Sequence, residues 1–182
     1  MFTHTQDALF STEECAEIVR LSQTELQDSG GLVGGQQQRE IRRAKISWLD
    51  DEGPAAWVMQ RIMGAVAKAN REVFDFDITD FREKLQVAVY DESEEGHYDW
   101  HSDIGEGPIA QFRKATIVTQ LSAPDAYEGG GLEINLGHKV MTAARDRGSA
   151  TLFASFMLHR VVPVQRGTRY SLTCWSHGPR FR

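Results

Sequence analysis

Short segments rich in β-branched and aromatic residues follow one another through the second half of the chain, each bounded by Gly, Asp or Pro. Short strands at such regular spacing are typical of a β-sandwich or barrel. A further alternating segment at residues 42–49 brings the expectation to about eight strands, the number that suits a jelly roll. The other expected strands cover residues 85–90, 98–102, 115–121, 131–136, 150–156, 159–164 and 169–176.

Two helices are predicted ahead of this β-rich region. Ser11, Thr12, Glu13 and Glu14 precede apolar residues at helical spacing, which is the pattern of a capped amphipathic helix. A second helix is expected from near Pro54, with apolar residues at helical spacing from residue 57 to 73. Helices followed by strands indicate the α+β class. We predict a single domain over residues 1–182, in which a helical and strand buttress (1–84) packs against a jelly-roll core (85–176).

Composition and charge exclude several classes of protein. The formal net charge of −6 argues against a nucleic-acid partner. No apolar run approaches the ~20 residues of a membrane span, and the first ten residues lack the features of a secretory signal. The two cysteines, Cys15 and Cys174, form no CxxC motif and no disulfide framework, so we expect two buried thiols and a cytoplasmic location. The sequence does not indicate an oligomeric state.

Two segments have the composition of loops. Residues 28–39 are rich in Gly and Gln, and residues 91–96 are largely acidic and end in Gly. Both are candidates for a lid over a substrate, and both are equally compatible with simple connections.

Two overlapping His-x-Asp pairs, His97 with Asp99 and His101 with Asp103, are the first candidates for chemistry. Residues two apart on a strand point to the same face, so each pair offers an imidazole and a carboxylate to one ion. Two histidines and one carboxylate with open positions opposite form the facial triad of iron oxygenases. The two pairs lie about 13 Å apart along an extended strand, so only one of them can join a distant histidine on the same ion.

The distal part of the chain supplies that histidine. His159 ends an apolar run, and Arg169 follows ten residues later across a turn that contains Gly167. A buried histidine and an arginine on consecutive strands can face one cavity, where the arginine offers a forked donor to a carboxylate.

Taken together, these segments resemble the Fe(II)/2-oxoglutarate-dependent oxygenases, in particular the prolyl 4-hydroxylase-like branch. The resemblance covers nearly the whole chain and is densest over residues 85–176. It implies a double-stranded β-helix, or jelly roll, with N-terminal helices packed against it. The segments that carry it are FSTEE (10–14), LQVAVY (85–90), YDWHSD (98–103), YEGGGL (127–132), LHRVVP (158–163) and RGTRYSLTCW (166–175).

The resemblance implies a role for each candidate residue. His101, Asp103 and His159 are the expected iron ligands, in preference to His97 and Asp99. The expected 2-oxoglutarate residues are Arg169, which replaces the lysine of many prolyl 4-hydroxylases, together with Tyr90, Ser171 and Trp175. The expected substrate residues are Tyr98 and Arg113, for which packing and a surface charge remain alternatives.

The implied reaction is hydroxylation of an unactivated carbon with release of succinate and carbon dioxide. Fe(II), 2-oxoglutarate and molecular oxygen are the implied cofactor and cosubstrates, with ascorbate as a stimulant. The expected substrate is a prolyl residue of a protein or peptide. A free amino acid or other small metabolite is an alternative substrate, and a cupin-like domain that binds a ligand without redox turnover is an alternative function.

Overall fold

The computed structural model describes residues 3–23, 32–33, 36–37 and 40–181, which form two main sheets, one two-stranded sheet and two main helices. The helices are α1 (Thr12–Gln23) and α2 (Ala56–Ala69), with short turns η1 (Gly53–Ala55), η2 (Asn70–Phe74), η3 (Glu92–Glu94) and η4 (Ala110–Phe112). The strands are β1 (Thr3–Gln6), β2 (Leu32–Val33), β3 (Gln36–Gln37), β4 (Arg42–Arg43), β5 (Lys45–Leu49), β6 (Leu85–Asp91), β7 (His97–His101), β8 (Arg113–Gln120), β9 (Tyr127–Gly129), β10 (Leu132–Asn135), β11 (Val140–Thr142), β12 (Ala150–Ala154), β13 (His159–Val161) and β14 (Val164–His177).

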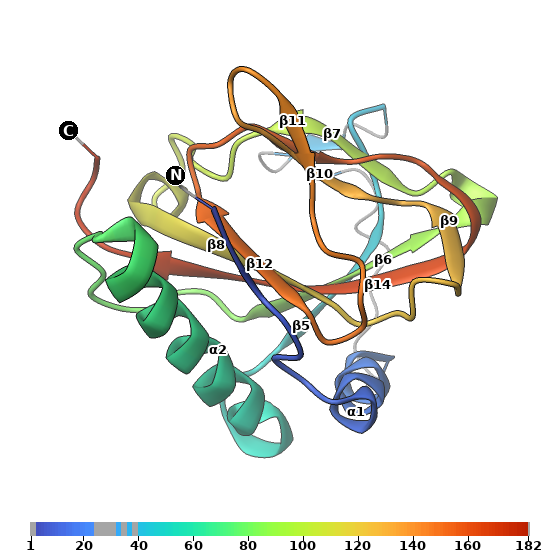
Figure 1. The fold of residues 1–182 in the computed structure, drawn as a ribbon, viewed down its shortest axis with the longest axis horizontal. Helices are drawn as coiled ribbons and strands as arrows, with labels where there is room; N and C mark the ends of the chain where they lie inside the picture. The colour runs from blue at the N-terminus through green and yellow to red at the C-terminus, as the bar shows by residue number, and fades with distance from the viewer. Residues whose placement is uncertain (1–2, 24–31, 34–35, 38–39, 182) are drawn as a thin grey trace.

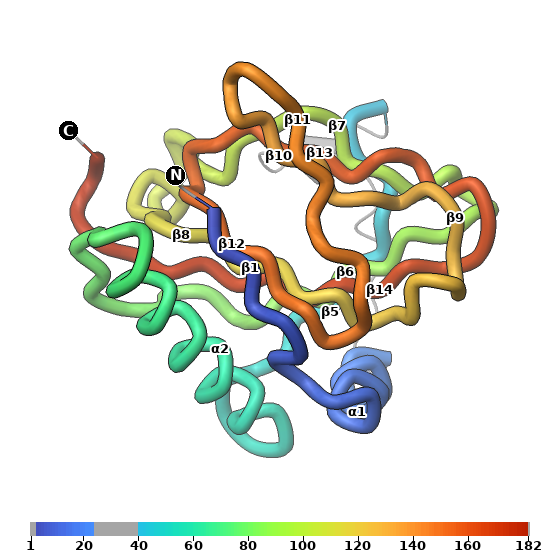
Figure 2. The backbone as a smooth tube through the Cα atoms, viewed as in Figure 1, coloured from blue at the N-terminus to red at the C-terminus, as the bar shows by residue number. Residues whose placement is uncertain are grey.

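The larger sheet has the order β1-β12-β8-β14-β6-β5, with β9 paired to β14, and the smaller sheet has the order β11-β10-β13-β7-β4. The pairs are antiparallel, and the two sheets face one another as the walls of a flattened barrel (Figure 1). Both helices cover the outer face of the larger sheet, on the side away from β10 and β13 (Figures 1 and 2). This is the predicted α+β jelly roll with helices packed against it.

Alternation along the central strands separates two cores. On β14, Leu172 and Cys174 face the helices and pack in the core beneath α1 and α2. On β6, Val87 faces the same helical core, whereas Ala88 and Tyr90 belong to the core between the sheets. Because neighbouring residues of a strand point to opposite faces, residues 169, 171, 173 and 175 of β14 face the interior of the barrel.

The capped first helix is confirmed in detail. The backbone N–H of Glu14 donates to Ser11 Oγ at 3.1 Å, and the N–H of Ser11 donates to Glu14 Oε2 at 2.9 Å. This reciprocal pair is a capping box. The second helix is also present, and its last turn, η2, has π-helical hydrogen bonding and ends at Asp75 in the left-handed conformation.

The predicted strands are present with small changes of boundary, and several further strands were not predicted. The segment expected at residues 42–49 is divided into β4 and β5, which belong to different sheets. The strands β1, β9 and β11 were missed, because they have three or four residues each and no clear apolar alternation. The two-residue strands β2 and β3 lie in the segment that was expected to be a loop. The N-terminal region therefore contributes edge strands to the larger sheet in addition to its helices.

Both cysteines are buried and free, as expected. Burial raises the pKa of the Cys15 thiol to about 11 and that of Cys174 to about 12. A thiol with such a pKa is protonated near neutral pH and is a poor nucleophile. Both cysteines therefore act as small hydrophobic side chains of the core.

The two candidate lid segments differ in what the structure describes. Most of residues 28–39 lies outside the described residues, apart from the β2–β3 pair. Residues 91–96 form a hydrogen-bonded turn, in which Asp91 Oδ1 accepts from the N–H of Ser93 at 3.0 Å. Glu92 Oε2 accepts from the N–H of Gly167 at 2.7 Å, so the turn is joined to β14. Through these bonds the acidic, Gly-containing segment is attached to the larger sheet.

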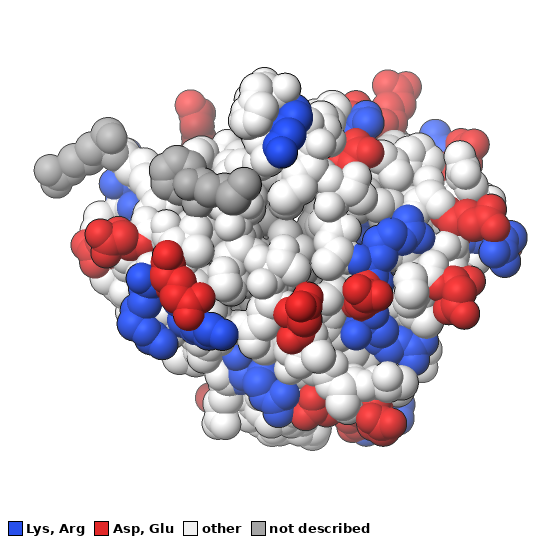
Figure 3. All heavy atoms as spheres, viewed as in Figure 1, with Lys and Arg blue, Asp and Glu red and all other residues white. Residues whose placement is uncertain are grey.

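The surface drawn in Figure 3 carries Lys and Arg side chains interspersed with Asp and Glu around a largely uncharged centre. Within the described part of the chain, no helix is both long and apolar enough to cross a membrane.

Gly148 joins the N-terminal segment to the larger sheet, and its replacement by alanine is expected to lower stability. Its φ is +81°, and an added Cβ would collide with the backbone oxygen of Phe10. We expect Gly148→Ala to cost about 2 kcal/mol or more, because both strain and a steric clash oppose the change. Thermal unfolding should then show a drop in Tm of roughly 4–8 °C.

Gly64, in the middle of α2, provides the matched control. An added Cβ there meets nothing within 4 Å, and alanine is favoured over glycine inside a helix by about 0.5–1 kcal/mol. Gly64→Ala should leave the Tm unchanged or raise it slightly. A Gly148→Ala variant as stable as Gly64→Ala would contradict the strain argument.

Candidate active site

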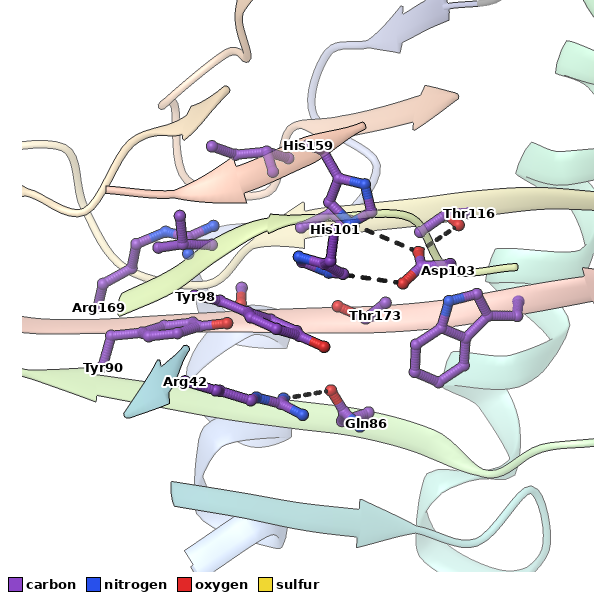
Figure 4. A pocket seen from close by; sticks show the side chains of 15 residues that line it. Arg42, Gln86, Tyr90, Tyr98, His101, Asp103, Thr116, His159, Arg169 and Thr173 are labelled. Atoms are coloured by element: carbon purple, nitrogen blue, oxygen red, sulfur yellow. Dashed lines mark hydrogen bonds and ion pairs between the residues drawn. The ribbon is translucent and has the colours of Figure 1, made fainter. Parts of the chain in front are cut away.

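His101, Asp103 and His159 meet at one end of the barrel, inside the space between the sheets. His101 ends β7 and His159 begins β13, and the antiparallel register places the two residues opposite one another. Asp103 follows two residues after His101. The potential ligand atoms of the three residues lie within 4.8 Å of one another, with Asp103 Oδ1 3.7 Å from His101 Nε2 and Asp103 Oδ2 3.6 Å from His159 Nε2 (Figure 4).

Both histidines are oriented through backbone carbonyls. His101 Nδ1 lies 2.7 Å from the carbonyl oxygen of Asp99, and His159 Nδ1 lies 3.0 Å from that of Met157. A carbonyl oxygen only accepts, so each Nδ1 carries a proton, and each Nε2 is the ring nitrogen on the side of Asp103. Burial and the neighbouring His159 lower the pKa of His101 to about 4, which keeps it neutral and able to bind a metal.

Asp103 is held at three points. Its backbone N–H donates to the carbonyl of Ser155 at 2.9 Å, and its Oδ2 accepts from Thr116 Oγ1 at 2.7 Å. Its own carbonyl accepts from Arg113 Nη1 at 3.0 Å. Burial opposes ionisation of Asp103, but the two imidazoles and the Thr116 hydroxyl outweigh it and keep the pKa of the carboxyl below its usual range. The residue is therefore a fixed anion that faces the two imidazoles.

Arg169 lies deeper in the same pocket. It is 1% exposed, and it pairs in register with Tyr90 of β6, so both side chains point into the barrel. Its Nε donates to Gln120 Oε1 at 3.0 Å, whereas its buried Nη1 and Nη2 have no hydrogen-bond partner among the described residues. Burial lowers the pKa of Arg169, and the phenols of Tyr90 and Tyr127 oppose this shift. Two parallel N–H donors are thus available to a carboxylate.

Tyr98 lies between His101 and a second arginine. Its ring stacks on His101 with a centroid separation of 3.5 Å, and Arg42 lies 4.7 Å from the ring centroid (Figure 4). Burial raises the pKa of the Tyr98 phenol, so it remains protonated and able to donate a hydrogen bond. Arg42 Nη2 donates to Gln86 Oε1 at 2.9 Å, and its buried Nε has no hydrogen-bond partner within the described ranges.

These residues line one pocket between the two sheets. It contains eight of the nine residues proposed for the site from the sequence, which are Tyr90, Tyr98, His101, Asp103, His159, Arg169, Ser171 and Trp175. The structure brings these eight side chains together. His97 lies apart, with its ring nitrogens against the backbone carbonyls of Glu95 and Glu40.

Arg113, the ninth, does not line this pocket. Its Nε and Nη2 bind the two carboxylate oxygens of Glu83 at 2.7 and 2.5 Å, and its Nη1 binds the carbonyl of Asp103. Its guanidinium lies 3.9 Å from the ring centroid of Trp175, which does line the pocket. The described contacts therefore place Arg113 behind the pocket wall, and its predicted contact with substrate stays a prediction.

Sequence reasoning missed several polar residues of the pocket. Gln86 lines the pocket, and Gln120 accepts a hydrogen bond from Arg169. Both face inward because they share the alternation of Tyr90 and Thr116 on their own strands. That alternation was visible in the sequence and would have identified them. Arg42 gave no such signal, because its place depends on the pairing of β4 with β7.

The sequence segment that carries this site matches a known protein family. Residues 85–177, just over half of the chain, match the family described as the 2OG-Fe(II) oxygenase superfamily. The chain belongs to this superfamily. The resemblance read from the sequence is therefore confirmed.

Curated relatives of this 2OG-Fe(II) oxygenase are named PKHD-type hydroxylases. The protein from Crocosphaera subtropica is 26% identical over 179 residues, which are 95% of this chain and 77% of the relative. The protein from Delftia acidovorans is 47% identical over 58 residues, which are 31% of this chain and only 25% of the relative. Several matches thus cover a minor part of the relative's length.

Solved structures confirm the fold. A prolyl hydroxylase from Trichoplax adhaerens, in complex with a hypoxia inducible factor peptide fragment, gives a TM-score of 0.78 at 21% identity and covers 96% of this chain and 83% of that one. A Pseudomonas putida prolyl-4-hydroxylase gives 0.74 at 21% identity and covers 97% and 92%. At this identity, the likeness concerns the double-stranded β-helix alone.

Family membership makes this chain a 2-oxoglutarate-dependent dioxygenase domain, with Fe(II), 2-oxoglutarate and molecular oxygen as its cofactor and cosubstrates. The residues fit these groups. Two imidazoles and one carboxylate are the donor set that Fe(II) takes in such oxygenases, and the buried, unpaired nitrogens of Arg169 suit a dicarboxylate.

Proposed function

We propose that this oxygenase hydroxylates a prolyl residue of a protein or peptide, with conversion of 2-oxoglutarate to succinate and carbon dioxide. One atom of molecular oxygen enters the C–H bond of the substrate as a hydroxyl group. The other atom enters the new carboxylate of succinate, and the first carbon of 2-oxoglutarate leaves as carbon dioxide. No external reductant is needed in this balance.

In this proposal, His101, Asp103 and His159 hold the iron. The bound metal supplies open coordination positions at which cosubstrate and oxygen meet. The chain's own part is to hold three ligand atoms in place, and the hydrogen bonds to Asp99, Met157 and Thr116 do this.

Arg169 is the main evidence for the proposed binding of 2-oxoglutarate in this pocket. It is a buried cation whose two terminal nitrogens lack a partner among the described residues, in the same pocket as a metal-binding triad. Leaving such donors unpaired costs free energy, which binding of a carboxylate recovers. Tyr90, Ser171 and Trp175 also line this pocket and complete the proposed 2-oxoglutarate site.

Several observations support a peptide substrate. The curated relatives are named hydroxylases, and the similar structures include prolyl hydroxylases, one of them with a bound peptide fragment. Tyr98 and Arg42 line the pocket together with the triad. Both carry donors, which suits the carbonyl oxygens of a peptide.

Incubation of the enzyme with Fe(II), 2-oxoglutarate and a panel of proline peptides and free amino acids tests the proposal. Mass spectrometry should show one added oxygen atom on proline of a peptide, with succinate formed in equal amount. Oxidation confined to a free amino acid or small metabolite, with every proline peptide unchanged, would replace the substrate class and leave the oxygenase assignment intact.

Tyr98→Phe removes only the hydroxyl group and keeps the ring that stacks on His101. We expect about a tenfold loss of hydroxylation, equivalent to one hydrogen bond to the substrate, while the affinities for metal and 2-oxoglutarate change by less than about twofold. Succinate formed without hydroxylation should persist. Product and succinate are measured together in the same assay.

Tyr170→Phe is the matched control, because Tyr170 packs against the helical core on the opposite face of β14. It should hydroxylate at the wild-type rate. Equal rates for Tyr98→Phe and Tyr170→Phe would remove the Tyr98 hydroxyl from substrate binding.

A further inference from the structure

A buried cluster of charged and polar side chains lies behind the metal end of the pocket. Glu83 accepts from Arg113 Nε and Nη2 at 2.7 and 2.5 Å, and Glu83 Oε2 also lies 3.0 Å from His177 Nε2. The side chains of Arg113, Glu83 and His177 are 16%, 14% and 0% exposed. None of the three lines the pocket.

Hydrogen bonding fixes the state of the histidine in this cluster. His177 Nδ1 accepts from the backbone N–H of Arg82 at 3.2 Å, so the ring proton is on Nε2 and is donated to Glu83. Burial opposes ionisation of Glu83, but the hydrogen bonds from Arg113 and His177 outweigh it and lower the pKa of the carboxyl. Glu83 is therefore a carboxylate anchored from two sides, and it fixes the guanidinium of Arg113.

The third nitrogen of that guanidinium reaches the metal end of the site. Arg113 Nη1 donates to the carbonyl of Asp103 at 3.0 Å. Asp103 leaves the regular pairing of β7, so its position depends on the bonds to Ser155, Thr116 and Arg113. Of these three bonds, only the one from Arg113 holds the backbone carbonyl of Asp103, from which the chain continues toward β8.

We propose that Glu83, Arg113 and His177 form a positioning unit that holds the backbone of Asp103, and with it the carboxylate, in the geometry that binds the metal. This inference rests on the proposed role of Asp103 as a ligand. In this arrangement, Arg113 acts on metal binding through Asp103 and is not itself a metal ligand. Groups that orient a metal ligand in this way typically contribute about 10–100-fold to metal affinity.

The test measures the binding of Mn²⁺ alone by titration calorimetry, with the Tm of each metal-free variant recorded in parallel. Arg113→Met should weaken Mn²⁺ binding by about tenfold or more. Glu83→Gln releases one end of the guanidinium and should give a smaller loss of the same sign. A Co²⁺-loaded Arg113→Met variant should also show an altered visible absorption spectrum, because that spectrum reports ligand geometry.

The double variant Glu83→Gln/Arg113→Met controls for loss of metal binding that is caused only by unfolding. It removes both charges of the pair and so leaves no unpaired buried ion. If the three residues act as one unit, its Mn²⁺ affinity should equal that of Arg113→Met, because the second change removes nothing further. Losses that multiply would contradict the unit.

The pair Arg160 and Glu133 supplies a matched control. Arg160 follows His159 on β13, and its Nε donates to Glu133 Oε2 at 2.7 Å, but none of its described hydrogen bonds reaches the backbone of a triad residue. Arg160→Met should keep wild-type Mn²⁺ affinity. Equal losses in Arg160→Met and Arg113→Met would overturn the proposal, as would Arg113→Met with wild-type affinity and spectrum.

Asp103→Ala separates failure of this inference from failure of the proposed site. If Asp103→Ala loses Mn²⁺ while Arg113→Met binds it normally, the triad stands and the positioning unit is wrong. If Asp103→Ala binds Mn²⁺ as the wild type does, the ligand assignment itself fails, and the positioning proposal fails with it.

Discussion

Asp103→Ala is expected to abolish both metal binding and turnover. The two imidazoles that remain offer two ligand atoms, and the carboxylate between them is the one anion among the pocket's described lining residues. Loss of that charge removes the strongest attraction for a divalent cation in this pocket. No conversion of 2-oxoglutarate to succinate should be detectable above the background without enzyme.

Thermal unfolding gives an independent measure. A ligand present at 100 times its Kd stabilises a folded protein by about 2.7 kcal/mol. Mn²⁺ at such a concentration should therefore raise the Tm of the wild type by roughly 5–11 °C and leave that of Asp103→Ala unchanged. A cooperative thermal transition of metal-free Asp103→Ala would show that this variant is folded.

His97→Ala is the control for this prediction. It removes the other histidine of the overlapping pairs, whose ring is bound to the carbonyls of Glu95 and Glu40. We expect wild-type metal binding. A His97→Ala variant that lost metal, beside an Asp103→Ala variant that kept it, would show that the wrong pair had been assigned.

Arg169→Ala is expected to raise the apparent KM for 2-oxoglutarate by tenfold to more than a hundredfold. A hydrogen bond to a charged group contributes about 1.5–3 kcal/mol, and Arg169 has two buried nitrogens that can bind one carboxylate. Binding of Mn²⁺ without cosubstrate should change by less than about twofold, because the guanidinium does not belong to the triad. Initial rates across a range of 2-oxoglutarate concentrations measure the first effect.

Arg166→Ala serves as its control. Arg166 lies three residues earlier on β14, and its side chain is 60% exposed and paired with Glu128. Its KM should match that of the wild type. An unchanged KM in Arg169→Ala would remove this arginine from the cosubstrate site.

Much of this architecture was predictable because alternation within a strand is local information. The segment at residues 169–176 shows it directly: Leu172 and Cys174 face the helices, so Arg169 and Ser171 face the pocket. The spacing of His101 and Asp103 carried similar information. Residues on one strand thus revealed their shared face without knowledge of the partner strands.

Features that depend on the pairing of distant segments were not predictable in this way. The position of Arg42 beside Tyr98 follows from the β4–β7 register, which joins residues far apart in the chain. The engagement of Arg113 by Glu83 depends on a residue 30 positions away. The strand β1 has a polar sequence, and only its pairing with β12 makes it a strand.

The length of β14 restricts how proteins with this architecture can diverge. One uninterrupted strand, Val164–His177, carries the proposed cosubstrate residues, the pocket residue Trp175 and, at its end, His177. Insertion or deletion of a single residue between Arg169 and Leu172 would turn every later side chain of the strand to the opposite face and bring Leu172 and Cys174 inward. Gains and losses of residues are therefore confined to the connections between strands, and within β14 the pocket can change only by substitution.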